Sequence, residues 1–135
     1  MPYVAPTGAP NLPSVDLQAV RAEMGAPPWR KPLIASPATR WVLISWPAGF
    51  VSVPHHHPRG EEVFYVLAGT AMFRFGDGAA EPLARPGTLL VAPRGVVHTI
   101  GVPGPEPLVF LASVAPNEDA DDETVEDLAV PTLEL

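Results

Sequence analysis

The chain has 135 residues, of which 47% are hydrophobic and 17% charged, so it can form one packed domain but not two with separate cores. Its 19 prolines and 11 glycines disfavour long helices and suit short strands joined by turns. The absence of cysteine excludes disulfides, thiolate metal sites and thiol nucleophiles. The sequence has no apolar run long enough to span a bilayer and no signal segment at its start. We therefore expect a cytoplasmic protein with no membrane partner.

The net charge of −7 is unevenly distributed along the chain. Residues 1–115 contain all eight Lys and Arg residues against seven acids, which gives this part a charge near +1. Residues 116–135 contain eight acids and no base, and we expect them to form a solvated acidic tail, with a docking role as the alternative. The chain lacks the basic stripe that nucleic-acid binding requires, so no nucleic-acid partner is expected.

The first 40 residues precede the main run of predicted strands. Residues 1–13 are rich in proline and indicate an extended arm. Ser14 can cap a short helix that runs to about Met24 and stops at Gly25. Prolines at positions 27, 28 and 32 then predict an extended linker as far as residue 40, in which a first strand could lie.

From residue 41 the sequence is dominated by short runs of β-branched, aromatic and aliphatic residues. These runs predict strands at 41–46, 50–57, 62–68, 70–75, 88–92, 96–102 and 108–114. Gly76, Asp77 and Gly78 predict a hairpin turn, since Gly and Asp tolerate the backbone angles that a tight turn needs. Many short strands with no helix between them indicate an all-β domain, an antiparallel sandwich or barrel, over residues 41–115.

Three of the four histidines fall on one predicted strand. Because side chains alternate between the two faces of a strand, His55 and His57 point the same way and His56 points the opposite way. Val51 and Val53 share the face of His55 and His57, which predicts that this face is the interior. Two imidazoles inside an apolar barrel are costly unless a partner satisfies their nitrogens.

Two further polar residues can supply that partner. Glu62 opens the next predicted strand five residues after His57, on the same parity as Phe64 and Val66, and His98 opens another strand. Three imidazole nitrogens and one carboxylate oxygen suit a single divalent transition metal (Mn, Fe, Ni, Co, Cu or Zn). We therefore predict one metal site with four ligands, His55, His57, Glu62 and His98.

The spacing of these residues resembles that of the cupin superfamily, which is marked by two short motifs. The first motif has Gly, five residues, His-x-His, three or four residues, Glu, six residues and Gly. Here it is matched at every fixed position, by Gly49, His55, His57, Glu62 and Gly69.

The second motif has Gly, five residues, Pro-x-Gly, two residues, His, three residues and Asn. The sequence matches it with Gly87, Pro93, Gly95 and His98, and departs from it only at Val102, where Asn is expected. That Asn is not a metal ligand, so the predicted ligand set is unaffected. The resemblance implies a small jelly-roll-like antiparallel β-barrel with a metal site.

The same resemblance bears on the neighbouring residues and on assembly. It implies a homodimer with an exchanged N-terminal strand, in which Trp29, Trp41 and Trp46 could pack at the subunit interface. Glu61 as the carboxylate ligand would also fit the first motif's shorter gap, but it gives the wrong spacing to Gly69. Arg59 and Arg94 lie in loops near the expected barrel mouth. There they could bind a substrate carboxylate, although a solvated arginine is the simpler interpretation.

Cupins carry out many kinds of chemistry, so the resemblance leaves three functions open. The favoured one is a dioxygenase-type oxidation of a small molecule, with Glu62 also moving a proton. A metal-dependent isomerase or lyase is the second, and a non-catalytic module that binds a small ligand or a metal is the third.

Overall fold

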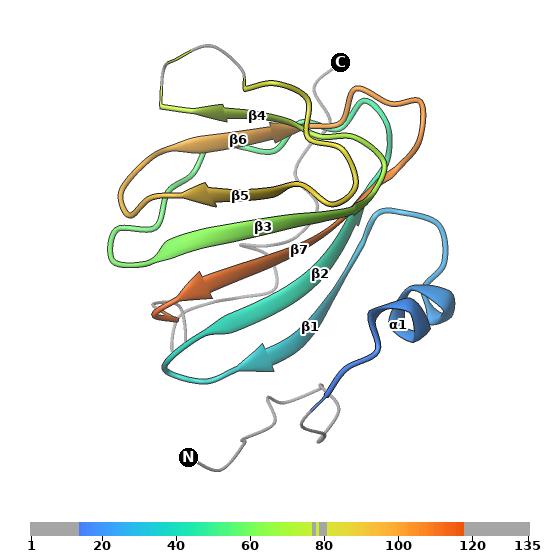
Figure 1. Cartoon of the computed structure of the whole chain (residues 1–135), viewed down its shortest axis with the longest axis horizontal. Coiled ribbons are helices and arrows are strands. Elements are labelled where there is room, and N and C mark those ends of the chain that lie inside the picture. Colours follow the sequence, from blue (N-terminus) through green and yellow to red (C-terminus); the bar gives the residue numbers. More distant parts are fainter. Residues whose placement is uncertain (1–13, 77, 79–80, 118–135) are drawn as a thin grey trace.

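The computed structural model describes residues 14–76, 78 and 81–117 (Figure 1). The predicted N-terminal arm, the centre of the predicted turn at Asp77 and nearly all of the acidic tail lie outside these described residues. The described residues form one helix and seven strands: α1 (Leu17–Glu23), β1 (Trp29–Ala35), β2 (Arg40–Trp46), β3 (Glu61–Ala68), β4 (Met72–Phe75), β5 (Leu89–Ala92), β6 (His98–Gly101) and β7 (Leu108–Ala115).

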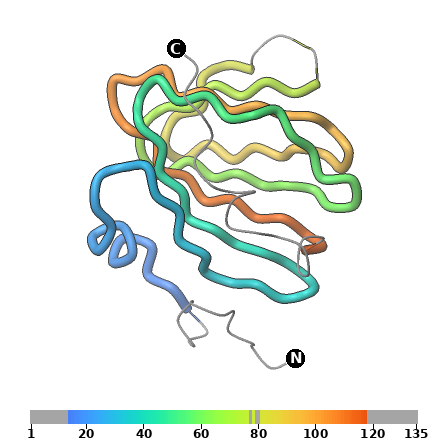
Figure 2. The backbone as a smooth tube through the Cα atoms, turned by 180° about the vertical axis from the view of Figure 1, so that it is seen from behind, coloured from blue at the N-terminus to red at the C-terminus, as the bar shows by residue number. Residues whose placement is uncertain are grey.

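The strands form two antiparallel sheets, which confirms the all-β prediction. Five strands make the larger sheet in the order β1-β2-β7-β3-β5, and β4 pairs with β6 in the smaller one. Figures 1 and 2 show the sheets curving around a common interior, and the chain between β2 and β3 is joined to β6 by isolated bridges. The barrel is thus assembled from strands distant in sequence.

The inward side chains of both sheets form one aromatic core. Phe50, Phe64, Phe73 and Phe110 are all fully buried within it. Along β3 the buried positions alternate from Glu62 through Phe64 to Val66, as the sequence parity predicts. The same alternation that buries the aromatic rings therefore carries a carboxylate into the barrel.

The segment predicted as a strand at 50–57 is not a continuous strand. It is joined to β6 by two isolated bridges, one between Val51 and Gly101 and one between His55 and His98. Between these bridges the segment has one residue more than β6, which is the geometry of a β-bulge.

Because of the bulge, the residues just before the histidines point to the opposite face from the one predicted. An extra residue exchanges the inner and outer faces, so Ser52 is buried whereas Val53, predicted to lie inside, is 61% exposed. His57 is nevertheless buried and His55 is half-buried, because both follow the bulge. The predicted orientation of the two histidines is confirmed, but Val53 is not evidence for it.

The N-terminal part of the described chain packs on the outer face of the larger sheet. Helix α1 is shorter than predicted and is capped by the side chain of Asp16, which accepts hydrogen bonds from the backbone of Gln18 and Ala19, instead of by Ser14. Leu17 and Val20 of this helix pack on an outer cluster centred on Leu33, Leu43 and Val109. The segment predicted as a linker contains β1, which pairs with β2 at the edge of the sheet.

The three tryptophans lie in two different environments. Trp46 belongs to the barrel core, where its ring centroid is 4.5 Å from that of Phe50 and 5.0 Å from that of Phe110. The expectation that Trp46 lies at a subunit interface is therefore wrong. Trp29 and Trp41 are partly buried against the outer cluster.

The one helix of the described chain is too short and too polar to cross a membrane.

Candidate metal centre

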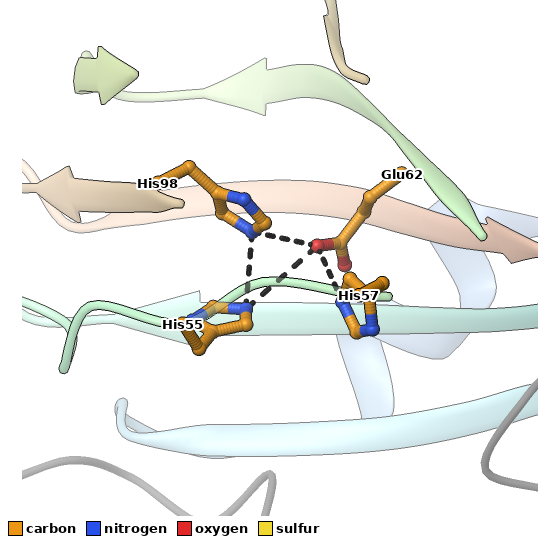
Figure 3. Close-up of side chains that lie close together, drawn as sticks. All are labelled: His55, His57, Glu62 and His98. Carbon is orange, nitrogen blue, oxygen red and sulfur yellow. Dashed lines mark hydrogen bonds and ion pairs between the residues drawn. The ribbon is translucent and has the colours of Figure 1, made fainter. Parts of the chain in front are cut away.

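The four predicted ligands converge at one end of the barrel (Figure 3). His55 and His57 come from the bulged segment, Glu62 from the start of β3 and His98 from the start of β6. Each offers one ligand atom, and these atoms all lie within 4.8 Å of one another. The structure thus brings together all four residues that the sequence singled out.

Glu62 lies at the centre of the cluster. Its Oε1 is 2.9 Å from Nε2 of His98, 3.1 Å from Nε2 of His57 and 3.8 Å from Nε2 of His55. The Nε2 atoms of His55 and His98 are 3.1 Å apart. Ligand atoms bound at right angles to one ion at about 2.1 Å are separated by about 3.0 Å, so these separations fit a shared ion.

Backbone carbonyl groups orient two of the imidazoles. Nδ1 of His55 lies 3.1 Å from the carbonyl oxygen of Val53, and Nδ1 of His98 lies 3.2 Å from that of Val96. A proton on Nδ1 that is donated to this carbonyl leaves the Nε2 lone pair directed into the cluster, as a metal ligand requires. Sequence reasoning missed both partners, because a backbone carbonyl has no residue signature.

The four residues of the cluster differ in exposure. His98, Glu62 and His57 are buried, with His98 only 1% exposed. The side chain of His55 is 40% exposed, so it is the member of the cluster in contact with solvent. The amide of Gly95 donates a hydrogen bond of 2.8 Å to the carbonyl of His57, which holds the second motif's turn against the first motif.

The electrostatics of the cluster favour an ionised carboxylate. Burial of the Glu62 side chain raises its pKa, but hydrogen bonds with His55, His57 and His98 and the charge of His57 outweigh burial and hold the pKa well below the ordinary value of 4.5. An ionised oxygen among three imidazole nitrogens is a donor set that divalent transition metals accept. The residues therefore fit a metal ion.

The other polar residues considered near the site stay outside the cluster. His56 is exposed, as the strand parity predicts, and Glu61 is exposed beside the buried Glu62. The prediction that Glu62 is the residue facing the imidazoles is therefore confirmed over the alternative with Glu61. Arg59 and Arg94 are both exposed, in the loops on either side of the site.

Comparison with known proteins decides the family. The family model described as Cupin domain matches residues 42–114, which include all four clustered residues. The chain belongs to the cupin family. The glycine-framed motifs and the barrel had pointed to this assignment independently.

This cupin is similar to proteins of diverse origin. Germin-like protein 5-1 of rice (Oryza sativa subsp. japonica) is 35% identical over 72 residues, which are 50% of this chain and 31% of that protein. The chain thus spans about a third of the length of that curated relative. The structure of TT1209 from Thermus thermophilus is 26% identical with a TM-score of 0.67, covering 78% of this chain and 98% of its own. That of KdgF from Halomonas sp. is also 26% identical, with a TM-score of 0.60 and coverages of 67% and 81%.

The lowered pKa of Glu62 predicts a pH dependence of stability in the metal-free protein. A carboxyl whose pKa falls on folding stabilises the folded state fully above its unfolded pKa, and this contribution is lost as the pH falls through the lower folded pKa. We expect the melting temperature of the metal-free cupin to fall as the pH is lowered from neutral past 4.5, and Glu62→Gln to flatten that slope.

Thermal melts over a pH series check this expectation, with Glu61→Gln as the matched control because Glu61 is the exposed neighbour. The control should keep the wild-type slope. An identical slope in Glu62→Gln and the wild type would show that the buried carboxylate does not contribute in this way.

Proposed function

We propose that this cupin is a metal-dependent enzyme that oxidises a small molecule with dioxygen. The observation that carries the proposal is the convergence of three imidazole nitrogens and one carboxylate oxygen in a cluster of which only His55 is substantially exposed. Four protein ligands leave two positions for further donors at a six-coordinate transition metal, and such open positions separate catalytic from purely structural sites. Substrate would approach past His55.

The surroundings of the cluster support chemistry that is sheltered from water. The ring of Phe64 lies 5.5 Å from that of His98, and the ring of Phe75 lies 6.4 Å from it. Behind them the barrel is filled by buried aromatic and aliphatic side chains. An apolar wall of this kind excludes water and strengthens the electrostatic interactions at the site.

The proposal assigns distinct roles to the chain's own residues. A bound redox metal would supply activation of dioxygen and polarisation of substrate oxygen atoms. His55, His57 and His98 hold their Nε2 atoms toward the ion, two of them through the carbonyl contacts described above. Glu62 contacts two imidazoles through Oε1 and would hold the ion, and once released from the ion its carboxylate would carry a proton to or from substrate.

A metal-dependent isomerase or lyase is the second candidate. Three imidazole nitrogens and a carboxylate oxygen also suit zinc, which polarises substrate oxygens without any redox step. No other catalytic acid, base or nucleophile is evident in the sequence, which keeps a non-catalytic binding module as the third candidate.

Oxygen uptake separates these candidates. We expect the iron- or manganese-loaded cupin to consume oxygen with at least one substrate from a panel of catechols, enediols, thiols and oxalate. The zinc-loaded protein and His98→Gln should both be inactive, whereas His56→Gln should keep wild-type activity. Turnover without oxygen uptake would favour the isomerase or lyase. Saturable binding without any turnover would favour the module, and either result would overturn the dioxygenase proposal.

We also propose that the protein is a homodimer, as the family resemblance implies. We propose further that it is cytoplasmic and has no nucleic-acid or membrane partner. Exposed apolar side chains support a self-association surface: Leu89 and Val91 of β5 lie opposite Tyr65 and Val63 of β3 at one edge of the larger sheet. Such a patch is typical of interaction sites. Sedimentation equilibrium should give twice the chain mass, and Leu89→Glu should lower it to that of a monomer. A wild-type protein that sediments as a monomer would rule the dimer out.

A further inference from the structure

A cavity lies on the outside of the barrel. It has a volume of about 350 Å³ and is bordered by the end of α1, the start of β1 and the residues that lead into β7. This volume is within the range of small-molecule sites. In Figure 1 helix α1 lies at the end of the larger sheet where β1 begins, whereas β3 and β6, which carry Glu62 and His98, begin at the opposite end.

The floor of the cavity is a row of side chains across four strands. Trp29 of β1 lies opposite Ser45 of β2. Ser45 in turn lies opposite Val109 of β7, whose other neighbour is Ala68 of β3. Directly opposed residues of antiparallel strands share a face, so a large ring stands beside three shorter side chains. The side chains of Ser45, Val109 and Ala68 are too short to fill the space beside the indole of Trp29, and this space is the cavity.

This row faces away from the metal centre. The residues on either side of Ser45, Ile44 and Trp46, both pack in the barrel core. Since successive side chains of a strand point to opposite faces, Ser45 faces the outer side of the sheet. A molecule in this cavity is therefore separated from the metal centre by the sheet itself.

Ser45 supplies a polar group at the bottom of the cavity. The residue is only 2% exposed and it lines the cavity. A hydroxyl can both donate and accept a hydrogen bond, so Ser45 can bind a polar atom of a molecule that enters the cavity.

Two residues of opposite charge border the cavity. Arg21 comes from α1 and Glu106 from the loop before β7. Among the described residues Arg21 contacts the side-chain oxygen of Gln18, and no ion pair joins Arg21 to Glu106. A guanidinium binds a carboxylate and a carboxylate binds an ammonium group, so the two residues complement a ligand that carries both charges.

We propose that this cavity binds a small zwitterion with an apolar or aromatic side chain, of the class of the free amino acids. Its carboxylate pairs with Arg21 and its ammonium group with Glu106. Its side chain packs on Trp29, and a polar atom of its backbone meets the hydroxyl of Ser45. The site is separate from the candidate metal centre, so this proposal does not depend on the proposed function and is tested separately from it.

Calorimetric titration of the metal-free wild-type protein with L-phenylalanine tests the proposal. We expect saturable binding at millimolar concentration or below, with amide NMR shifts at residues 21, 45 and 106. The analogues 3-phenylpropanoate, which lacks the ammonium group, and 2-phenylethylamine, which lacks the carboxylate, should each bind about tenfold more weakly or worse. Equal binding by either analogue would overturn the zwitterion assignment.

Variants of the two charged residues that border the cavity locate the site, since neither side chain belongs to the buried core. Arg21→Gln and Glu106→Gln should each weaken L-phenylalanine binding about tenfold, and Ser45→Val, which fills the floor, should abolish it. Arg74→Gln, which removes an exposed arginine on β4, is the control and should bind as the wild type does. Melting temperatures report whether each variant is folded. The proposal is wrong if L-phenylalanine does not bind or if both rim variants bind normally. A change of sedimentation in the rim variants instead would assign the cavity to a contact between chains.

Discussion

Replacing His98 by glutamine is expected to weaken metal binding by at least about a hundredfold. His98 is the most deeply buried member of the cluster, and its Nε2 lies within 3.1 Å of both Oε1 of Glu62 and Nε2 of His55. Removing it leaves two imidazoles and one carboxylate, of which His55 is the least enclosed. Glutamine keeps a polar side chain of similar length, so the barrel should still fold. Metal content after dialysis measures the loss.

The same change should appear as a loss of metal-dependent stability. A ligand present at a thousand times its dissociation constant stabilises a folded protein by about 4 kcal/mol. For a domain of this size we expect the wild type to melt about 15 °C higher when a tightly bound divalent metal is added. The His98→Gln variant should show almost no such increase.

His56→Gln is the matched control, since His56 lies between two of the predicted ligands but its side chain is exposed and outside the cluster. It should bind metal and gain stability as the wild type does. If His56→Gln loses as much metal as His98→Gln, the exposed His56 takes part in binding and the four converging residues are not the ligand set.

Gly69→Ala is expected to prevent folding or to destabilise the barrel by more than about 4 kcal/mol. Gly69 follows β3 with a φ of +75°, a region that L-residues other than glycine rarely adopt. A Cβ at this position would lie 2.1 Å from the carbonyl oxygen of Pro107 and 3.0 Å from Cα of Leu108. Both are backbone atoms at the start of β7, so they cannot move aside without breaking the pairing of β3 with β7.

Gly87→Ala separates the cost of backbone strain from the cost of the clash. Gly87 has a φ of +92°, but a Cβ there meets nothing within 4 Å. This variant should fold and lose only about 1–2 kcal/mol. Urea denaturation of both variants measures the difference. Similar losses in the two would show that the approach of Pro107 to Gly69 does not constrain the fold.

The candidate site was predictable because its geometry follows from local rules. Alternation along β3 places Glu62 with Phe64 and Val66 in the interior whatever the rest of the sheet does. The motif spacings also carry information, because glycines such as Gly69 stand where a side chain would collide. The four converging residues could therefore be named from residue types and intervals alone.

The bulge before the histidines was not predictable in the same way. No residue type in the segment 51–55 indicates a bulge. A bulge is defined relative to the partner strand, so it becomes apparent only when this segment is paired with β6. Val53 consequently faces solvent in spite of an interior pattern. The correct inward direction of His55 and His57 rests on the bulge, which the sequence does not reveal.

The start of the domain is a second region whose structure could not be predicted from the sequence. Prolines in the segment 27–32 suggested a linker, yet β1 lies there, because Pro32 is tolerated at the edge of a sheet where one side of the strand has no partner. Edge position is a property of the whole topology and cannot be inferred from the segment itself. The cap of α1 is a local matter, but Ser14 and Asp16 are equally suitable residue types, and only the structure distinguishes them.

X-ray absorption spectroscopy of the metal-loaded wild-type protein tests most directly whether these side chains hold one ion. We predict one transition-metal ion per chain, with three imidazole nitrogens and one carboxylate oxygen in its inner coordination sphere. A spectrum with no imidazole scattering, or a purified protein that takes up no transition metal at all, would contradict the account.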